Sequence, residues 1–193
     1  MDSSRPLPRA TELAHSLVRE RLREGDTAVD ATVGNGHDTL FLAHLVGPAG
    51  RVIGFDIQKE AIEATREKTR EVTNVSLHHA SHERMEDFVA TSVKAVLFNL
   101  GYLPSADKTI TTQPGTTVAA LEASLRLLLP GGLITIAVYT GHEGGAVEAE
   151  TIEEFIRTLP QETYSAALYQ FLNQRNSPPH LIAVERKTKP EKA

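Results

Sequence analysis

Two glycines and a carboxylate stand at a spacing that is typical of a nucleotide site. Gly34 and Gly36 follow a short apolar segment, and Asp56 ends the next one. Glycine lets a backbone turn tightly and approach a ligand without a Cβ clash, and a carboxylate at the end of a second strand can accept hydrogen bonds from ribose hydroxyls. A plain glycine-rich turn and a helix-capping aspartate are the ordinary interpretations. The position and spacing of the three residues together favour the interpretation that Asp56 binds a ribose.

Two neighbouring residues indicate which nucleotide is bound. A dinucleotide loop usually carries a third glycine where its helix begins, so that a pyrophosphate can reach the helix N-terminus. In this chain that position is Thr39. The upstream acidic residue Asp30 is in addition characteristic of methyltransferases. These features favour S-adenosylmethionine over NAD as the cofactor.

The elements that must position these residues alternate along the chain. Apolar residues at helical spacing predict helices over 10–22, 38–45, 59–72, 83–90, 118–128 and 152–159. Apolar runs predict strands over 27–30, 51–56, 75–79, 94–99, 133–139, 165–171 and 180–185. Five strand–helix units with apolar strands predict a sheet covered on both faces. We therefore expect an α/β fold: a doubly wound, mostly parallel, seven-stranded Rossmann-like sheet with an antiparallel last strand.

Composition limits the class of protein. The 193 residues suit a single domain, 1–193, with 1–9 and 187–193 expected to be flexible ends. Cysteine is absent, which excludes disulfides and thiolate metal sites, and no apolar run is long enough to span a membrane. No signal peptide is recognised, so a cytoplasmic location is the default expectation. The net charge of −5 argues against broad, sequence-independent nucleic-acid binding but allows contact with one loop of a structured RNA.

A family resemblance runs through nearly the whole chain. The segment from Asp30 to Thr39, Asp-Ala-Thr-Val-Gly-Asn-Gly-His-Asp-Thr, resembles the signature of a small bacterial family long labelled rRNA methylases and now assigned as tRNA 5-aminomethyl-2-thiouridine methyltransferases. Thr32, where class I methyltransferases generally have glycine, looks normal for this family, whereas Thr140 replaces a family proline. The resemblance continues through 56–58, 81–83, 99–104, 139–144, 173–174 and 178–179.

The resemblance implies a set of cofactor contacts that adds to Asp30, Gly34 and Gly36. The ordinary interpretation of Ser81 is a helix cap, and that of His82 is a solvated turn residue. Ser81 and His82 follow the third strand, where this fold usually holds the adenine. Gln58 lies two residues after Asp56, the carboxylate that is expected to bind the ribose. The implied contacts come from Asn35, His37, Asp56, Gln58, Ser81 and His82.

The acceptor side is expected after the fourth and fifth strands. Asn99 and Tyr102 loosely resemble the Asn-Pro-Pro-Tyr motif of amino-group methyltransferases, in which polar oxygens hold an amine and the aromatic ring stacks on a base. A strand-end turn and a half-buried surface tyrosine are the alternatives. An aminomethyl nitrogen must be neutral to attack, and His142 or Asp107 is a candidate to receive its proton.

A tRNA anticodon loop is the partner that this reading predicts. Lys108, Arg175 and the segment 173–179, which begins at Asn173, are candidates to contact it. Recognition of one splayed-out wobble uridine suits a protein with no inserted RNA-binding domain. The sequence leaves the oligomeric state open, with a homodimer as one arrangement.

The leading functional hypothesis is N-methylation of the aminomethyl group of 5-aminomethyl-2-thiouridine at the tRNA wobble position. The net charge of −5 favours a small-molecule methyltransferase as one alternative. The older family label suggests methylation of a ribosomal base as another. A dehydrogenase or a non-catalytic nucleotide-binding module is the alternative from a different class, and affinity for NAD would distinguish it.

Overall fold

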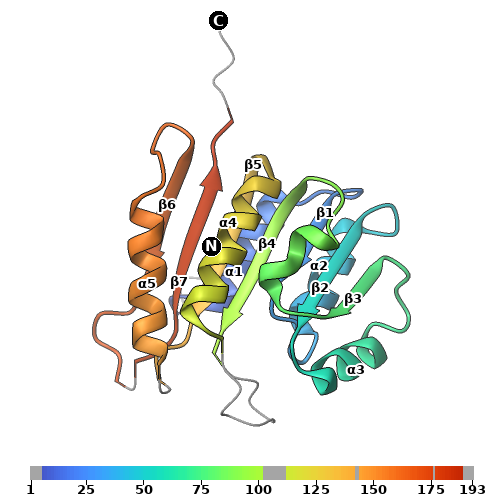
Figure 1. Ribbon diagram of the computed structural model, residues 1–193, viewed down its shortest axis with the longest axis horizontal. Helices are drawn as coiled ribbons and strands as arrows, with labels where there is room; N and C mark the ends of the chain where they lie inside the picture. The colour runs from blue at the N-terminus through green and yellow to red at the C-terminus, as the bar shows by residue number, and fades with distance from the viewer. Residues whose placement is uncertain (1–5, 102–111, 142–143, 176, 189–193) are drawn as a thin grey trace, which may run out of the picture.

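A computed structural model describes residues 6–101, 112–141, 144–175 and 177–188 (Figure 1). Seven strands form one sheet in the order β3-β2-β1-β4-β5-β7-β6. They are β1 (Thr27–Asp30), β2 (Arg51–Asp56), β3 (Val75–His79), β4 (Val93–Leu100), β5 (Leu128–Val138), β6 (Tyr164–Tyr169) and β7 (His180–Arg186). The strands β1 to β5 pair in parallel, and β7 runs antiparallel to both β5 and β6. The predicted fold class is therefore confirmed.

Helices cover both faces of this sheet (Figure 1). They are α1 (Ala10–Arg21), α2 (His37–Val46), α3 (Lys59–Lys68), the 3₁₀ helix η1 (His82–Asp87), α4 (Pro114–Leu127) and α5 (Gly145–Arg157). Among the helices of the described residues, none is both long and apolar enough to cross a membrane.

Alternating residues of the central strands supply two separate cores, one on each face of the sheet. Val96 and Phe98 of β4 lie in the core that includes η1, α4 and α5. Ala95 and Leu97 lie in the core that includes α1 and α2. A strand buried on both faces has no polar alternation, which is why residues 95–98 of β4 are all apolar.

Some boundaries differ from the sequence-based prediction. Leu128 continues the helical stripe of α4, but it begins β5 and pairs with Val93. The strand predicted over 133–139 therefore begins earlier, and Pro130 to Gly132 lie inside β5, where the register shifts between Val93 and Ala95. The helix expected over 59–72 ends at Lys68, and the one expected over 83–90 is the shorter 3₁₀ helix η1.

The two segments expected to be flexible ends are described in part. The hydroxyl of Tyr169 donates to the carbonyl of Pro8 over 2.8 Å. The backbone N–H of Lys187 donates to Thr163 O over 2.8 Å, extending the pairing of β6 with β7. Residues 1–5 and 189–193 lie outside the described residues.

Candidate active site

A cavity of about 600 Å³ opens at the carboxyl ends of β1 to β5. Its position follows from the sheet order: from β1 the chain continues to β2 and β3 on one side, and it then crosses back to β4 on the other side of β1. Such a switch point leaves a crevice. The volume lies within the range of cofactor and small-molecule sites. Most of the predicted site residues in the described part of the chain line it: Gly34, Asn35, His37, Asp56, Gln58, Ser81, His82 and Asn99.

The loop after β1 depends on glycine at two positions. Gly34 and Gly36 have φ angles of +52° and +72°, a region that side chains with a Cβ rarely adopt. A Cβ atom on Gly36 would lie 2.6 Å from Oγ1 of Thr65 on α3. The same hydroxyl donates to the carbonyl of Gly34 over 3.1 Å. Gly36 thus faces α3 rather than the cavity, and its small size lets helix and loop approach each other.

Asp30 supports this loop from below and does not line the cavity. Its side chain is fully buried, and it accepts hydrogen bonds from the Thr39 hydroxyl at 2.6 Å and from the Thr32 N–H at 3.2 Å. Burial, with the nearby charge of Asp38 as the next cause, raises the pKa of Asp30 to about 7. Thr39, which replaces the third glycine of a dinucleotide loop, is therefore a partner of Asp30.

Asp56 holds the loop from the side of β2. One carboxylate oxygen accepts from the N–H of Gly34 and the other from the N–H of Gln58, each at 2.9 Å. Gln58 is the N-cap residue of α3. A carboxylate has about four lone-pair sites, so both oxygens keep acceptor capacity on the cavity side. Because the N-cap residue is Gln58 and α3 has no side-chain cap hydrogen bond, the helix-capping alternative for Asp56 is wrong, and the ligand-binding interpretation stays a prediction.

His82 brings a buried acceptor without a partner to the cavity wall. The residue is 8% exposed, and its Nδ1 lies 3.2 Å from the carbonyl of Ala31. Burial lowers the pKa of His82, so the ring is neutral, Nδ1 carries the proton, and Nε2 is an acceptor. Among the described residues Nε2 has no hydrogen-bond partner. Its neighbour Ser81 makes no side-chain capping bond to η1.

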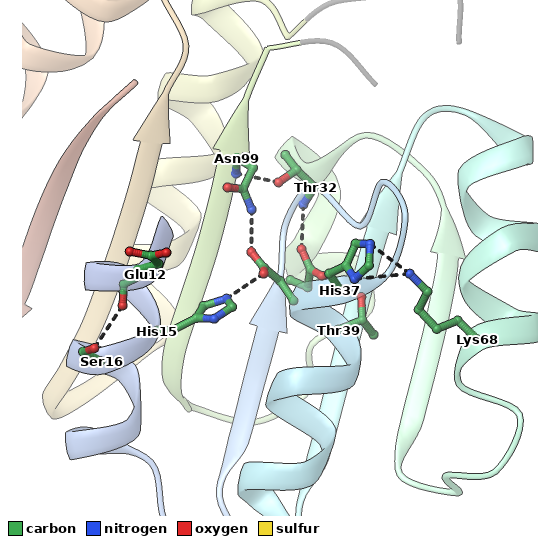
Figure 2. A network of polar contacts seen from close by, with 10 residues as sticks. Glu12, His15, Ser16, Thr32, His37, Thr39, Lys68 and Asn99 are labelled. Carbon is green, nitrogen blue, oxygen red and sulfur yellow. Dashed lines mark hydrogen bonds and ion pairs between the residues drawn. The ribbon is translucent and has the colours of Figure 1, made fainter. Parts of the chain in front are cut away.

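His37 and Asn35 lie where the loop after β1 enters α2, and both line the cavity. The ammonium group of Lys68 on α3 lies 3.2 Å from Nε2 of His37 (Figure 2). A lysine can only donate, so this ring nitrogen accepts when the bond forms.

Asn99, at the end of β4, joins a network that extends to α1 (Figure 2). Its backbone N–H donates to the hydroxyl of Thr32 over 2.7 Å, and its side-chain Nδ2 donates to Oδ2 of Asp38 over 2.6 Å. The other oxygen of Asp38 lies 2.7 Å from Nε2 of His15. The first-strand loop, the end of β4 and the first helix therefore meet at Asn99.

The remaining predicted residues of the acceptor side fall into two groups. Tyr102, Lys108 and His142 lie outside the described residues, as does Asp107. Asn173 and Arg175 are exposed in the connection between β6 and β7. That connection lies at the same edge of the sheet as the cavity, because His180 pairs with Val138 and Leu100 pairs with Val138 from the other side.

Three of the side chains that the sequence analysis did not predict in this region are polar groups next to Asn99 or the cavity wall: Asp38, Tyr139 and His15. Asp38 and Tyr139 line the cavity, and His15 contacts Asp38 from α1. Asp38 was missed because an aspartate in the first turn of a helix is usually explained by the helix dipole. His15 was missed because the sequence pattern of its helix reveals only the apolar face. Tyr139 does lie in a segment of the family resemblance, which is the one signal that could have found it.

The sheet order, with its antiparallel β7, and the cavity at the carboxyl edge define a class I S-adenosylmethionine-dependent methyltransferase. The chain belongs to the family described as "Putative rRNA methylase", whose model matches residues 52–185. A second methyltransferase model, that of protein-L-isoaspartate(D-aspartate) O-methyltransferase, matches residues 3–89. The predicted enzyme class is confirmed.

Individual relatives agree with the family. The chain is 41% identical over 183 residues to the chloroplastic tRNA (mnm(5)s(2)U34)-methyltransferase of Arabidopsis thaliana, covering 88% of this chain and 67% of the relative. A solved structure described as a "putative rRNA-methylase" from Clostridium thermocellum is 42% identical, with a TM-score of 0.92 over 94% of this chain and 100% of that chain. A solved structure described as "a putative methyltransferase" from Streptococcus mutans, in complex with S-adenosylhomocysteine, is 40% identical, with a TM-score of 0.87 over 94% of this chain and 99% of that chain. S-adenosylmethionine is therefore the cofactor, as predicted.

Proposed function

We propose that this methyltransferase acts on tRNA and methylates the aminomethyl nitrogen of 5-aminomethyl-2-thiouridine at the wobble position, giving 5-methylaminomethyl-2-thiouridine. The observation that carries the proposal is the 41% identity, over 88% of the chain, to a protein named for that modification of U34. The exact substrate is inferred from this relative. The proposal is supported by Asn99, which lies in the described site and is the expected contact to the methyl acceptor.

Residues on the β1–β3 side of the cavity fit the cofactor. Asp56 offers carboxylate acceptors to the ribose hydroxyls, and the backbone of Gly34 leaves room for close approach. The unpartnered Nε2 of His82 is suited to accept from an adenine amino group, which would satisfy an otherwise orphaned buried atom. Asn35, His37, Gln58 and Ser81 line the same part of the cavity and complete the proposed contacts.

Asn99 is the proposed contact to the methyl acceptor. Bound S-adenosylmethionine supplies an electrophilic sulfonium methyl group, which a neutral amine nitrogen takes up while the carbon–sulfur electron pair returns to sulfur. The protein's contribution is to hold that nitrogen in line, a proximity effect. Tyr102 and His142, which the resemblance places on the acceptor side, remain proposals because they lie outside the described residues.

The proposed partner is the anticodon loop of tRNA, with Lys108, Asn173 and Arg175 as candidate contacts. The exposure of Asn173 and Arg175 at the cavity edge of the sheet supports this placement. A homodimer and a cytoplasmic location remain predictions; the Arabidopsis relative is named as chloroplastic.

The test is nucleoside mass spectrometry of tRNA that carries 5-aminomethyl-2-thiouridine, before and after treatment with purified protein and S-adenosylmethionine. We expect the aminomethyl nucleoside to disappear and its singly methylated form to appear, and we expect Asn99→Ala, as the control variant, to transfer methyl far more slowly. Ribosomal RNA and a protein-free extract of small metabolites serve as parallel acceptors. If methyl groups are transferred to either of these acceptors while the tRNA stays unchanged, the proposed substrate is wrong.

A further inference from the structure

We propose that Asp38 is a positioning residue for the methyl acceptor: its carboxylate fixes which way the side-chain amide of Asn99 faces, and His15 supports that carboxylate from α1. The proposal rests on the proposed function, since it assigns a role at the amine-binding end of the same cavity. Asp38 and Asn99 both line the cavity, and neither Asp38 nor His15 was expected there from the sequence.

The contacts leave each oxygen of Asp38 with one donor. Asn99 Nδ2 lies 2.6 Å from Oδ2, and His15 Nε2 lies 2.7 Å from Oδ1 (Figure 2). The side chain of Asp38 is 16% exposed, so these bonds are partly shielded from water. The backbone N–H of Asn99 is held separately by the hydroxyl of Thr32. Asn99 is therefore fixed at both its backbone and its amide.

Charge determines the direction of the amide. Burial alone would raise the pKa of Asp38, but the hydrogen bond and charge of His15 and the hydrogen bond from Asn99 outweigh it, and the pKa is lowered. An ionised carboxylate can only accept hydrogen bonds. The amide of Asn99 must therefore turn its NH₂ group toward Asp38, which leaves its oxygen on the other side. Among the described residues, no hydrogen bond to that oxygen is found.

The direction of the amide matters for an amine acceptor. An amide oxygen accepts a hydrogen bond from an N–H of the amine and leaves the nitrogen lone pair free to attack. A reversed amide would point an N–H donor at the nitrogen and occupy that lone pair. Asp38 thus selects the orientation of Asn99 that is compatible with methyl transfer to nitrogen.

His15 is itself held in place by packing. Its ring stacks on Phe41 of α2 with centroids 3.9 Å apart and an interplanar angle of 11°. The guanidinium of Arg19 lies 5.2 Å from the same Phe41 ring. The stack orients Nε2 toward Asp38, so the first helix contributes to the geometry of the acceptor site. The ordinary interpretation, that Asp38 only stabilises the N-terminus of α2, predicts a loss of stability alone.

The test is a double-mutant cycle on single-turnover methyl transfer, using whichever acceptor the parent protein methylates. We expect Asp38→Ala to slow transfer by on the order of a hundredfold, because small misplacements of reacting groups have effects of this size. Adenosylmethionine affinity should stay near the parent's. In an Asn99→Ala background, Asp38→Ala should add little further loss, since it acts through Asn99. Asp38→Asn should restore part of the rate, because its oxygen can still face Asn99 while its NH₂ donates to a His15 that has changed tautomer.

Matched controls come from residues outside the site. Asp87→Ala removes an exposed carboxylate that pairs with Arg84, and His44→Phe replaces an exposed histidine of α2. Both should transfer methyl at the parental rate, whereas His15→Phe should be slower than His44→Phe. A parental rate in Asp38→Ala, or full additivity with Asn99→Ala, would overturn the positioning role.

A second readout does not depend on turnover. The side-chain NH₂ resonances of Asn99 in a nitrogen-15 correlation spectrum, assigned with Asn99→Asp, should be protected from solvent exchange in the parent and lose protection in Asp38→Ala. Unchanged protection would refute the proposal even if the substrate is correct. Conversely, failure to methylate tRNA together with lost protection would refute only the proposed substrate.

Discussion

Replacement of Gly36 by alanine should destabilise the protein even when no ligand is bound. The residue has a φ of +72°, and an added Cβ would lie 2.6 Å from Oγ1 and 2.8 Å from Cγ2 of Thr65. The left-handed backbone costs about 1–2 kcal/mol for a residue with a Cβ. Displacing Thr65 also breaks its hydrogen bond to Gly34 O, worth about 1 kcal/mol. We therefore expect Gly36→Ala to lower the free energy of unfolding by roughly 2–4 kcal/mol.

Thr65→Ala separates the two causes, because it removes both of the nearest atoms and leaves only the Thr65 Cβ, at 3.0 Å. In a cycle measured by urea unfolding, the double variant should be less destabilised than the sum of the single variants, by about 1–2 kcal/mol. The left-handed backbone should account for the remaining cost of Gly36→Ala. Calorimetry with S-adenosylhomocysteine would report the ligand-dependent part. Strict additivity would show that Thr65 does not limit the size of this residue. Parental stability of Gly36→Ala with lost ligand binding would show that this glycine makes room for the ligand instead of for α3.

Three further predictions concern carboxylates. Asp56→Ala should weaken S-adenosylmethionine binding by about 1–3 kcal/mol in calorimetry, because a charged acceptor is lost; unchanged affinity would exclude the ribose contact. Asp30 has a folded pKa of about 7 against 3.8, so the folded state holds its proton more tightly, and stability should fall as pH rises from about 4 to 7. Asp30→Asn should flatten this part of the pH dependence in urea titrations, by at most on the order of 4 kcal/mol; an unaltered slope would assign it to other groups. Glu148 is 2% exposed and accepts from the hydroxyls of Thr112 and Thr117. Glu148→Gln removes one of these acceptors and should lower the unfolding free energy by about 1–3 kcal/mol, and a parental urea midpoint would argue against both bonds.

Much of the sheet could be predicted from the sequence because several of its strands are short segments rich in apolar residues and bounded by polar residues or glycine. The predicted bounds of β1, β2 and β3 agree with the structure. The junction at Leu128 could not be predicted in this way. Helical periodicity and strand hydrophobicity coincide at a buried leucine, and its pairing with Val93 depends on the neighbouring strand.

The candidate site likewise contains residues that could be predicted from the sequence and residues that could not. Motif residues such as Gly34, Asp56 and His82 could be located because each lies at the end of a strand or within four residues after it, and parallel strands bring their carboxyl ends together. Asp38 and His15 could not, because they are brought together by the docking of two helices and are separated by 23 residues in the chain. Their contact is a property of packing rather than of any local pattern.

The docking of α1 also has a consequence for the order in which the chain folds. This helix packs against β5 and β7, Ala10 and Ala14 share a small core with Leu181, and the hydroxyl of Tyr169 reaches Pro8. The surface that receives the first helix is therefore completed by β7, which is synthesised after the other strands of the sheet. Contacts between residues so distant in sequence slow folding, and the apolar face of α1 has to wait, exposed, while the ribosome adds the remaining strands. Newly made chains should therefore need a chaperone during synthesis more than mature chains need one during refolding.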